Sequence, residues 1–245
     1  MLIVNADDWG GWHSATDAAL KYFSKGIVTS ASAMVFMEDS ERAAGLAKEN
    51  GLSTGLHLNF TQAFTGIAVN KQLERALRAT SKYLCSSRLA SLVYNPFLHA
   101  SFSRLCAAQI EEYRRLYGTE PTHINGHQHM HLCMNVIISG FLPRGAIVRR
   151  NFTFRKGEKS FLNRAYRDIL DARLSRHHTL TDQFYSLKSA IEHRRLSAIL
   201  EASKTNSVEL MTHPEWVIES QFLDDPENES ALHGVTVGDF SDLRH

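Results

Sequence analysis

Leu2-Ile3-Val4-Asn5-Ala6-Asp7-Asp8-Trp9-Gly10-Gly11 stands near the start of the chain and determines how the rest is interpreted. Its first three residues form a short apolar run, which is typical of a buried strand. The polar cluster and two glycines that follow are typical of a functional loop. This stretch therefore predicts a buried strand that carries two carboxylates at its carboxyl end.

Helix-like and strand-like segments alternate after this opening. Apolar spacing and end signals predict helices over 14–25, 41–50, 107–117, 132–139 and 187–202. Strand-like runs occupy 27–35, 54–60, 146–148 and 208–212, and another strand begins at His123. Such alternation implies a mostly parallel sheet. We expect an α/β fold, a (β/α) barrel in which chemistry gathers at the carboxyl ends of the strands.

Three regions do not follow this alternation of helices and strands. Residues 62–103 have weak periodicity and scattered aromatic residues, and we interpret them as an insertion. Residues 155–176 are basic and poorly patterned, which is typical of a solvated helix face; binding of an anionic substrate is a second interpretation. Residues 224–245 are predicted to form a partly irregular tail. We expect one domain over residues 1–245, because single α/β barrels commonly reach this length.

Composition restricts the class of protein and its partners. The 245 residues are 43% hydrophobic and 22% charged with a formal net charge of +1, which is ordinary for a soluble globular protein. This balance gives no global attraction to nucleic acid or to a membrane surface, and no apolar run is long enough for a membrane span. Three dispersed cysteines and an opening without features of a signal peptide predict a cytoplasmic location.

Acids and histidines fall at the ends of four predicted strands. Asp7 and Asp8 follow the first, and His57, His127 and His213 follow three others. In a parallel barrel these ends converge on one face. Alternation within 54–60 points His57 inward, while its leucine neighbours face the helices.

The segment His123-Ile124-Asn125-Gly126-His127-Gln128-His129-Met130-His131 has two interpretations. If the strand continues, His129 joins His127 on the polar face. If a helix starts near Gly126, His127 and His131 share a face at i, i+4 spacing. His127 belongs to the cluster in both cases.

Each feature also has a purely structural interpretation. A paired Asp after a strand can cap a helix or sit in a solvated turn. A lone inward histidine is commonly a hydrogen-bonded core residue, and His213 can be a strand-terminal residue before a turn. Four histidines within nine residues are harder to explain in this way, because every buried imidazole needs a polar partner. Metal binding or catalysis is therefore favoured for that segment.

Three blocks together resemble the YdjC-like carbohydrate deacetylases, which include chitooligosaccharide deacetylases. They are Asn5-Ala6-Asp7-Asp8-Trp9-Gly10, Gly55-Leu56-His57-Leu58-Asn59-Phe60-Thr61 and Thr122-His123-Ile124-Asn125-Gly126-His127-Gln128-His129-Met130-His131, with His213-Pro214 as a weaker fourth. The chain departs from the family pattern at four positions. Trp9 and Phe60 replace the more usual Phe and Leu, Asn125 stands where Asp is common, and Glu215 replaces a frequent Gly.

The resemblance implies a barrel of the polysaccharide-deacetylase type that holds a divalent metal. It assigns Asp8, His57 and His127 as metal ligands and Asp7 as the catalytic base, with an exchange of roles between the two acids left open. His213 becomes the candidate acid that protonates the leaving amine. Magnesium is the first choice of metal on family grounds, and zinc follows closely because two imidazoles favour a transition ion.

The implied reaction is removal of the N-acetyl group from an N-acetylated sugar, with release of acetate. The substrate is a small molecule, the insertion at 62–103 is expected to cover it, and a homodimer is left open. A metal-dependent phosphoesterase is the alternative enzyme, since Asp and His clusters at barrel ends also serve phosphate chemistry. A sugar-binding protein without turnover is the alternative outside enzymes.

Overall fold

The computed structural model describes residues 1–66, 69–154 and 157–243. The chain divides into two compact units. The first unit comprises Met1–Asp7, Asp17–Ala31 and Arg144–His245, and the second comprises Asp8–Thr16 and Ser32–Pro143. The boundary falls between Asp7 and Asp8, so each unit contains one of the two consecutive carboxylates.

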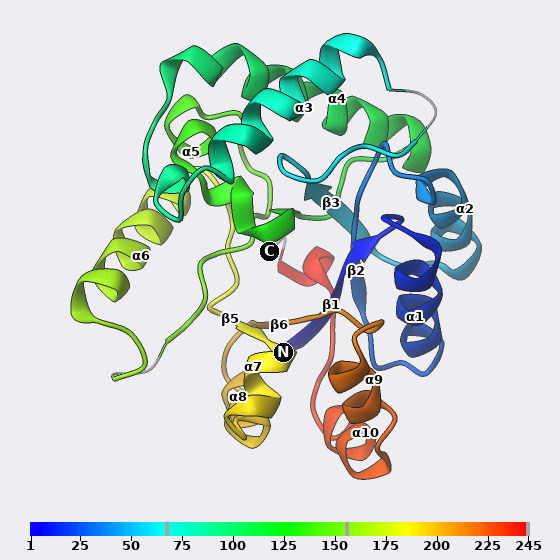
Figure 1. Cartoon of the computed structure of the whole chain (residues 1–245). Coiled ribbons are helices and arrows are strands. Elements are labelled where there is room, and N and C mark those ends of the chain that lie inside the picture. The colour runs from blue at the N-terminus through cyan, green and yellow to red at the C-terminus, as the bar shows by residue number, and fades with distance from the viewer. Residues whose placement is uncertain (67–68, 155–156, 244–245) are drawn as a thin grey trace. The chain divides into compact units, whose positions relative to one another are not determined.

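Helices and strands follow one another along the chain as the sequence predicts for an α/β fold (Figure 1). The strands are β1 (Leu2–Trp9), β2 (Ser30–Ala33), β3 (Thr54–Leu58), β4 (Ile124–Gly126), β5 (Gln183–Ser186) and β6 (Val208–Thr212). The helices are α1 (His13–Ser24), α2 (Ser40–Asn50), α3 (Lys71–Leu84), α4 (His99–Tyr117), α5 (Met134–Ser139), α6 (Phe161–Leu174), α7 (Leu187–Glu192), α8 (Leu196–Ser203), α9 (Val217–Leu223) and α10 (Pro226–His233). Short 3₁₀ helices cover Ala90–Leu92, Pro96–Leu98, His127–Leu132 and Phe240–Leu243.

The strands form one hydrogen-bonded sheet in the order β4-β3-β2-β1-β6-β5. In the first unit, β1 pairs in parallel with β6, so that Leu2 lies opposite Val208 and Ala6 opposite Thr212. Strand β5 pairs in parallel with the other side of β6. All residues of β1 and β6 are buried, which explains the apolar run 2–4 at the start of β1, whereas in β6 the buried Glu209 interrupts the apolar residues.

In the second unit, β3 pairs in parallel with β4, and His57 lies opposite Asn125. Gly55 is required for this pairing. A Cβ atom at that position would lie 2.3 Å from the imidazole of His123 and 2.5 Å from its backbone oxygen. The glycine of the Gly-Leu-His block therefore makes room for a buried histidine of the neighbouring strand.

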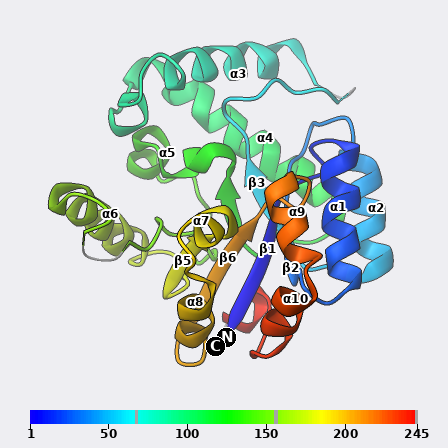
Figure 2. The same ribbon diagram turned by 60° about the horizontal axis from the view of Figure 1, so that its bottom comes forward.

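The most informative departure from the sequence prediction is α3, which lies inside the region interpreted as an unpatterned insertion. Its buried residues recur at helical spacing, and it packs beside α4 (Figure 2). Asn70 caps its first turn by accepting hydrogen bonds from the N–H groups of Gln72 and Leu73. The region 62–103 thus contributes a long capped helix, although Ile67 and Ala68 lie outside the described residues.

The basic stretch contains helix α6, as its interpretation as a helix face predicts, and Arg155 and Lys156 at its start lie outside the described residues. Two other predictions need correction. The helix predicted over 187–202 is two helices, because Arg194 between them has a left-handed φ of 51°. Residues 146–148 form no strand and contribute one isolated bridge, between Ile147 and Thr179. Among the described residues, no helix is long and apolar enough to cross a bilayer.

Candidate metal centre

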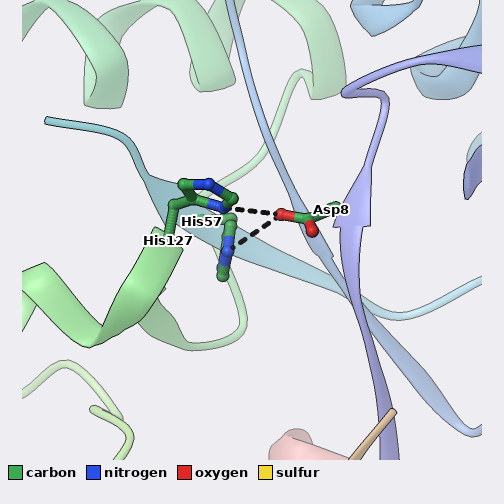
Figure 3. Close-up of side chains that lie close together, drawn as sticks. All are labelled: Asp8, His57 and His127. Atoms are coloured by element: carbon green, nitrogen blue, oxygen red, sulfur yellow. Dashed lines mark hydrogen bonds and ion pairs between the residues drawn. The ribbon is translucent and has the colours of Figure 1, made fainter. Parts of the chain in front are cut away.

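Three predicted site residues meet in the second unit. Asp8, His57 and His127 each offer a ligand atom, and these atoms all lie within 4.8 Å of one another. Figure 3 shows the carboxylate of Asp8 facing both imidazoles. Its Oδ1 lies 2.9 Å from Nδ1 of His127 and 3.3 Å from Nε2 of His57. The three residues are contributed by β1, β3 and the 3₁₀ helix after β4, far apart in sequence.

The backbone of Asp8 separates it from Asp7. Asp8 has a φ of 62°, a left-handed conformation that is uncommon outside glycine but tolerated by aspartate. Its carbonyl oxygen accepts a hydrogen bond from the N–H of Gly11, which closes a turn at the end of the strand. A conformation of this kind costs on the order of 1–3 kcal/mol and is found preferentially at functional sites. The turn directs the carboxylate of Asp8 to the two histidines.

His57 is oriented by a chain of buried side chains. Its Nδ1 lies 2.7 Å from Oδ1 of Asn125, so it donates its proton there and leaves Nε2 free to act as a ligand. Asn125 in turn donates to the hydroxyl of Ser32, which contacts Nε2 of His123 at 2.9 Å. His123 therefore supports the site rather than joining it.

We expect Asn125→Leu to weaken metal binding by about 10–100-fold, because the leucine removes the acceptor that fixes the ring of His57. Competition against a chromogenic zinc chelator measures this affinity. Asn125→Asp is the matched control, since it retains an acceptor oxygen at the same place. A folded leucine variant that binds as tightly as the wild type would contradict the assignment.

The histidine-rich segment follows neither alternative as stated, because the strand does not continue and the helix is interrupted by left-handed residues. Strand β4 ends at Gly126, and a 3₁₀ helix begins at His127. Gln128 and His129 have left-handed backbones, with φ values of 53° and 59°. His131 is buried beneath this turn, close enough that a Cβ atom on Gly126 would lie 2.9 Å from its backbone nitrogen. Within the described residues, the potential metal group contains neither His129 nor His131.

The electrostatics of the triad favour an anionic Asp8. Burial alone would raise the pKa of this carboxyl, but its interactions with the imidazoles of His127 and His57 outweigh burial and hold the pKa below its usual range. A carboxylate and two imidazole nitrogens are suitable donors for a divalent ion, and three protein ligands leave coordination positions for water or substrate. The donor set therefore fits the divalent metal that the sequence predicts.

Asp7 lies in a different environment, within the first unit. It accepts hydrogen bonds from both terminal nitrogens of Arg149, at 2.6 and 2.7 Å, and from Asn5 at 2.8 Å. Arg149 is fully buried and also contacts Glu209 at 2.6–2.7 Å. Burial alone would lower the pKa of Arg149, but the charges of Asp7 and Glu209 raise it above its usual range. Asp7 is thus rigidly held by a buried cation.

His213 lies after β6, also in the first unit. Its ring stacks on Trp216 at 4.0 Å between centroids and 4° between planes. Glu219 fixes the backbone at this point, since one carboxylate oxygen accepts hydrogen bonds from the N–H of His213 and the hydroxyl of Thr212, each at 2.7 Å. The turn that presents His213 is therefore anchored to a buried acid on α9.

The buried carboxyl of Glu219 also makes the free energy of unfolding depend on pH. Burial raises the pKa of Glu219 from 4.5 to about 7, against the opposing effect of its hydrogen bonds. Between these values the folded chain binds more protons than the unfolded chain, so the free energy of unfolding should fall as pH rises. The total loss is on the order of 3 kcal/mol.

Glu219→Gln should abolish this loss, because the amide keeps an acceptor and does not titrate. Urea unfolding at pH 5 and pH 8 measures the difference, with the exposed substitution Glu49→Gln as control. Equal pH dependence in the wild type and Glu219→Gln would show that this carboxyl titrates normally.

Sequence reasoning missed four residues that support these side chains. The four are Asn125, Arg149, Glu209 and Glu219, to which the sequence prediction assigns no role in the site. The sequence positions of two of these residues partly indicate a role in the site. Arg149 directly follows the apolar run 146–148, and Asn125 shares a face with His127. Glu219 has no such signal, since it lies on a helix beyond the last strand.

The sequence as a whole matches the model of one protein family, described as YdjC-like protein, over residues 1–236. The chain belongs to this family. This YdjC-like protein is 29% identical to a carbohydrate deacetylase of Clostridium beijerinckii, in an alignment covering 87% of the chain and 80% of the relative. It is 29% identical to a chitooligosaccharide deacetylase of Enterobacter sp., over 89% of the chain and 82% of the relative.

A solved structure supports the fold of this YdjC-like protein. A protein from Enterococcus faecalis described as a cellobiose-phosphate cleavage protein superposes with a TM-score of 0.72 at 18% identity. The superposition covers 99% of the chain and 98% of that structure. This likeness confirms the α/β fold class.

Proposed function

We propose that this YdjC-like protein is a metal-dependent N-deacetylase of N-acetylated saccharides of the chitooligosaccharide type. The observation that carries the proposal is the convergence of Asp8, His57 and His127, with Asp7 as the adjoining residue of the chain. The names of the curated relatives agree with this chemistry. The proposed reaction converts an acetamide and water into acetate and a free amine.

The metal is proposed to be divalent and to be held by Asp8, His57 and His127, with magnesium as the first candidate and zinc as the second. Such an ion supplies Lewis acidity, which polarises an acetyl carbonyl and acidifies the attacking water. Asn125 contributes indirectly, because it holds the Nδ1 proton of His57 and thereby keeps Nε2 available.

Asp7 is proposed as the general base that removes a proton from the attacking water. Arg149 and Asn5 fix its carboxylate, so no side-chain reorganisation is needed when the proton moves.

His213 is proposed as the general acid that protonates the departing amine. The stack on Trp216 restricts rotation of the ring, and Glu219 restricts the backbone that carries it. Protonation is essential for this step, because an amide anion is too basic to leave unaided. The products are acetate and the free amino sugar.

The test is acetate release from N-acetylglucosamine oligosaccharides, measured on the purified chain after treatment with chelator and after addition of Mg²⁺ or Zn²⁺. We expect activity that is lost on chelation and restored by one of the two ions. Release of phosphate from sugar phosphates, without acetate from any acetylated sugar, would select a phosphoesterase. Sugar binding without either product would select a non-catalytic binding protein.

A further inference from the structure

A cavity in the first unit borders a buried arginine, Arg195, that the proposed function does not use. The cavity has about 270 Å³ of space outside the protein atoms, part of it open to solvent. Its walls come from residues 152–154, from the end of β5, and from α7 and α8 with the residue before α8. Helix α7 packs against both β5 and α8 (Figure 2). The cavity therefore lies within one compact part of the fold.

Hydrogen bonds and ring stacking hold the walls of this cavity in place. Thr153 donates its N–H to the carbonyl oxygen of Phe184 at 2.9 Å, and its hydroxyl accepts the N–H of Phe184 at 3.0 Å. The rings of Phe152 and Phe184 stack with their centroids 4.5 Å apart. At the end of β5, the hydroxyl of Ser186 accepts the N–H of Ser189 and caps α7. The cavity is therefore largely preformed.

Arg195 brings a positive charge to this cavity. The residue is only 9% exposed, and its guanidinium lies 5.5 Å from the ring centroid of Tyr185. Its Nη1 forms an ion pair with Glu158 at 2.8 Å. Within the described part of the chain, Nε and Nη2 of Arg195 are buried and have no hydrogen-bond partner. A buried donor without a partner is unfavourable, so this edge of the guanidinium is suited to bind a ligand.

Other arginines of the chain show what the edge formed by Nε and Nη2 binds. In Arg114 these nitrogens contact the two carboxylate oxygens of Glu120, at 2.6 and 3.0 Å. In Arg42 they contact the two carboxylate oxygens of Asp39, each at 2.7 Å. Such bidentate pairing matches the planar guanidinium to the two oxygens of a carboxylate. Arg195 has the same pair of donors at the cavity, and no carboxylate of the described residues contacts them.

The ion pair with Glu158 does not prevent a second carboxylate from binding Arg195. Arg149, which is also buried, contacts the carboxylates of both Asp7 and Glu209. Because the pair of Arg195 and Glu158 is already neutral, a bound monoanion adds one negative charge and a phosphate dianion adds two. Repulsion from Glu158 therefore favours a monoanion.

We propose that this cavity binds a short-chain monocarboxylate, whose two oxygens pair with Nε and Nη2 of Arg195. Phe152, Ala190 and Ile199 also line the cavity and suit a short alkyl group. Acetate belongs to this class. Its selection as the natural ligand rests on the proposed function, which releases acetate, whereas the class of ligand is inferred from Arg195 and the cavity alone.

The experiment is a ligand-observed NMR titration of the chain with acetate at constant ionic strength. A chelator is present so that no divalent ion at the triad attracts the carboxylate. We expect acetate to bind at least about tenfold more tightly than acetamide, which has a similar shape but neither the charge nor the second acceptor oxygen. Inorganic phosphate should bind more weakly than acetate.

Arg195→Lys retains a cation for Glu158 but removes the two-donor edge, so the affinity for acetate should fall by at least about tenfold. Arg194→Lys is the matched control, because it makes the same change at the neighbouring exposed residue, which does not line the cavity. Glu158→Gln should reduce the preference for acetate over phosphate, since it removes the nearby negative charge. The midpoint of thermal unfolding checks that each variant is folded.

Equal binding of acetate and acetamide by the wild type, or unchanged acetate affinity in a folded Arg195→Lys variant, would overturn the proposal. Tighter binding of phosphate than of acetate would overturn the assignment to a monocarboxylate. The proposed reaction is measured separately, by acetate release from acetylated sugars. Acetate binding that depends on Arg195, without acetate release, would contradict the proposed reaction alone. Acetate release without such binding would contradict this inference alone.

Discussion

Asp7→Asn should lower acetate release by about 10²–10⁴-fold while the chain still binds its metal, because the amide cannot accept the proton of the attacking water. Asp8→Asn should instead lose the metal, since Asp8 faces both histidines of the triad. Steady-state acetate release and equilibrium metal titration of both variants measure the two effects. Together the two variants distinguish a general base from a metal ligand at consecutive positions of the chain.

Two controls address the structural role of Asp7. Asp168→Asn makes the same change at an exposed position of α6 and should leave activity and metal affinity unchanged. Formate added to Asp7→Ala should restore part of the rate by replacing the carboxylate. Loss of metal from Asp7→Asn, with metal retained in Asp8→Asn, would reverse the two roles.

Arg149→Met should destabilise the chain by about 3–5 kcal/mol, the range observed when one partner of a buried ion pair is removed. The substitution leaves the carboxylates of Asp7 and Glu209 buried without the cation that both contact. It also removes the guanidinium that lies 4.8 Å from the ring centroid of Phe184. Urea unfolding of the wild type and the variant measures the loss.

The pH dependence identifies the cause of this destabilisation. Without the cation, burial favours the protonated carboxyls in the folded chain, so the loss should be smaller at acid pH and larger at neutral pH. Arg149→Met/Glu209→Leu should recover part of the stability by removing one buried charge. Arg173→Met, at an exposed position of α6, should change stability by less than about 0.5 kcal/mol. A pH-independent loss in Arg149→Met would point to packing rather than to charge.

Local sequence patterns determined most elements of the fold. The apolar run 2–4 identified β1, because a strand buried on both faces of a parallel sheet needs no polar alternation. Gly51 closed α2 as predicted, since glycine adopts the left-handed conformation at a helix end without steric cost. Helix α3 was missed because its apolar residues are few and separated by charges, although they fall on one face.

Sequence position placed acids and histidines at the ends of predicted strands, and the resemblance to the YdjC-like family selected Asp8, His57 and His127 among them as candidate metal ligands. What only the tertiary structure decided was the environment of each group. The left-handed turn at Asp8 separates two adjacent carboxylates, and Asp7 accepts hydrogen bonds from Arg149, which lies 142 residues away in the sequence. Contacts between residues so distant in sequence depend on sheet order and packing, which local periodicity does not encode.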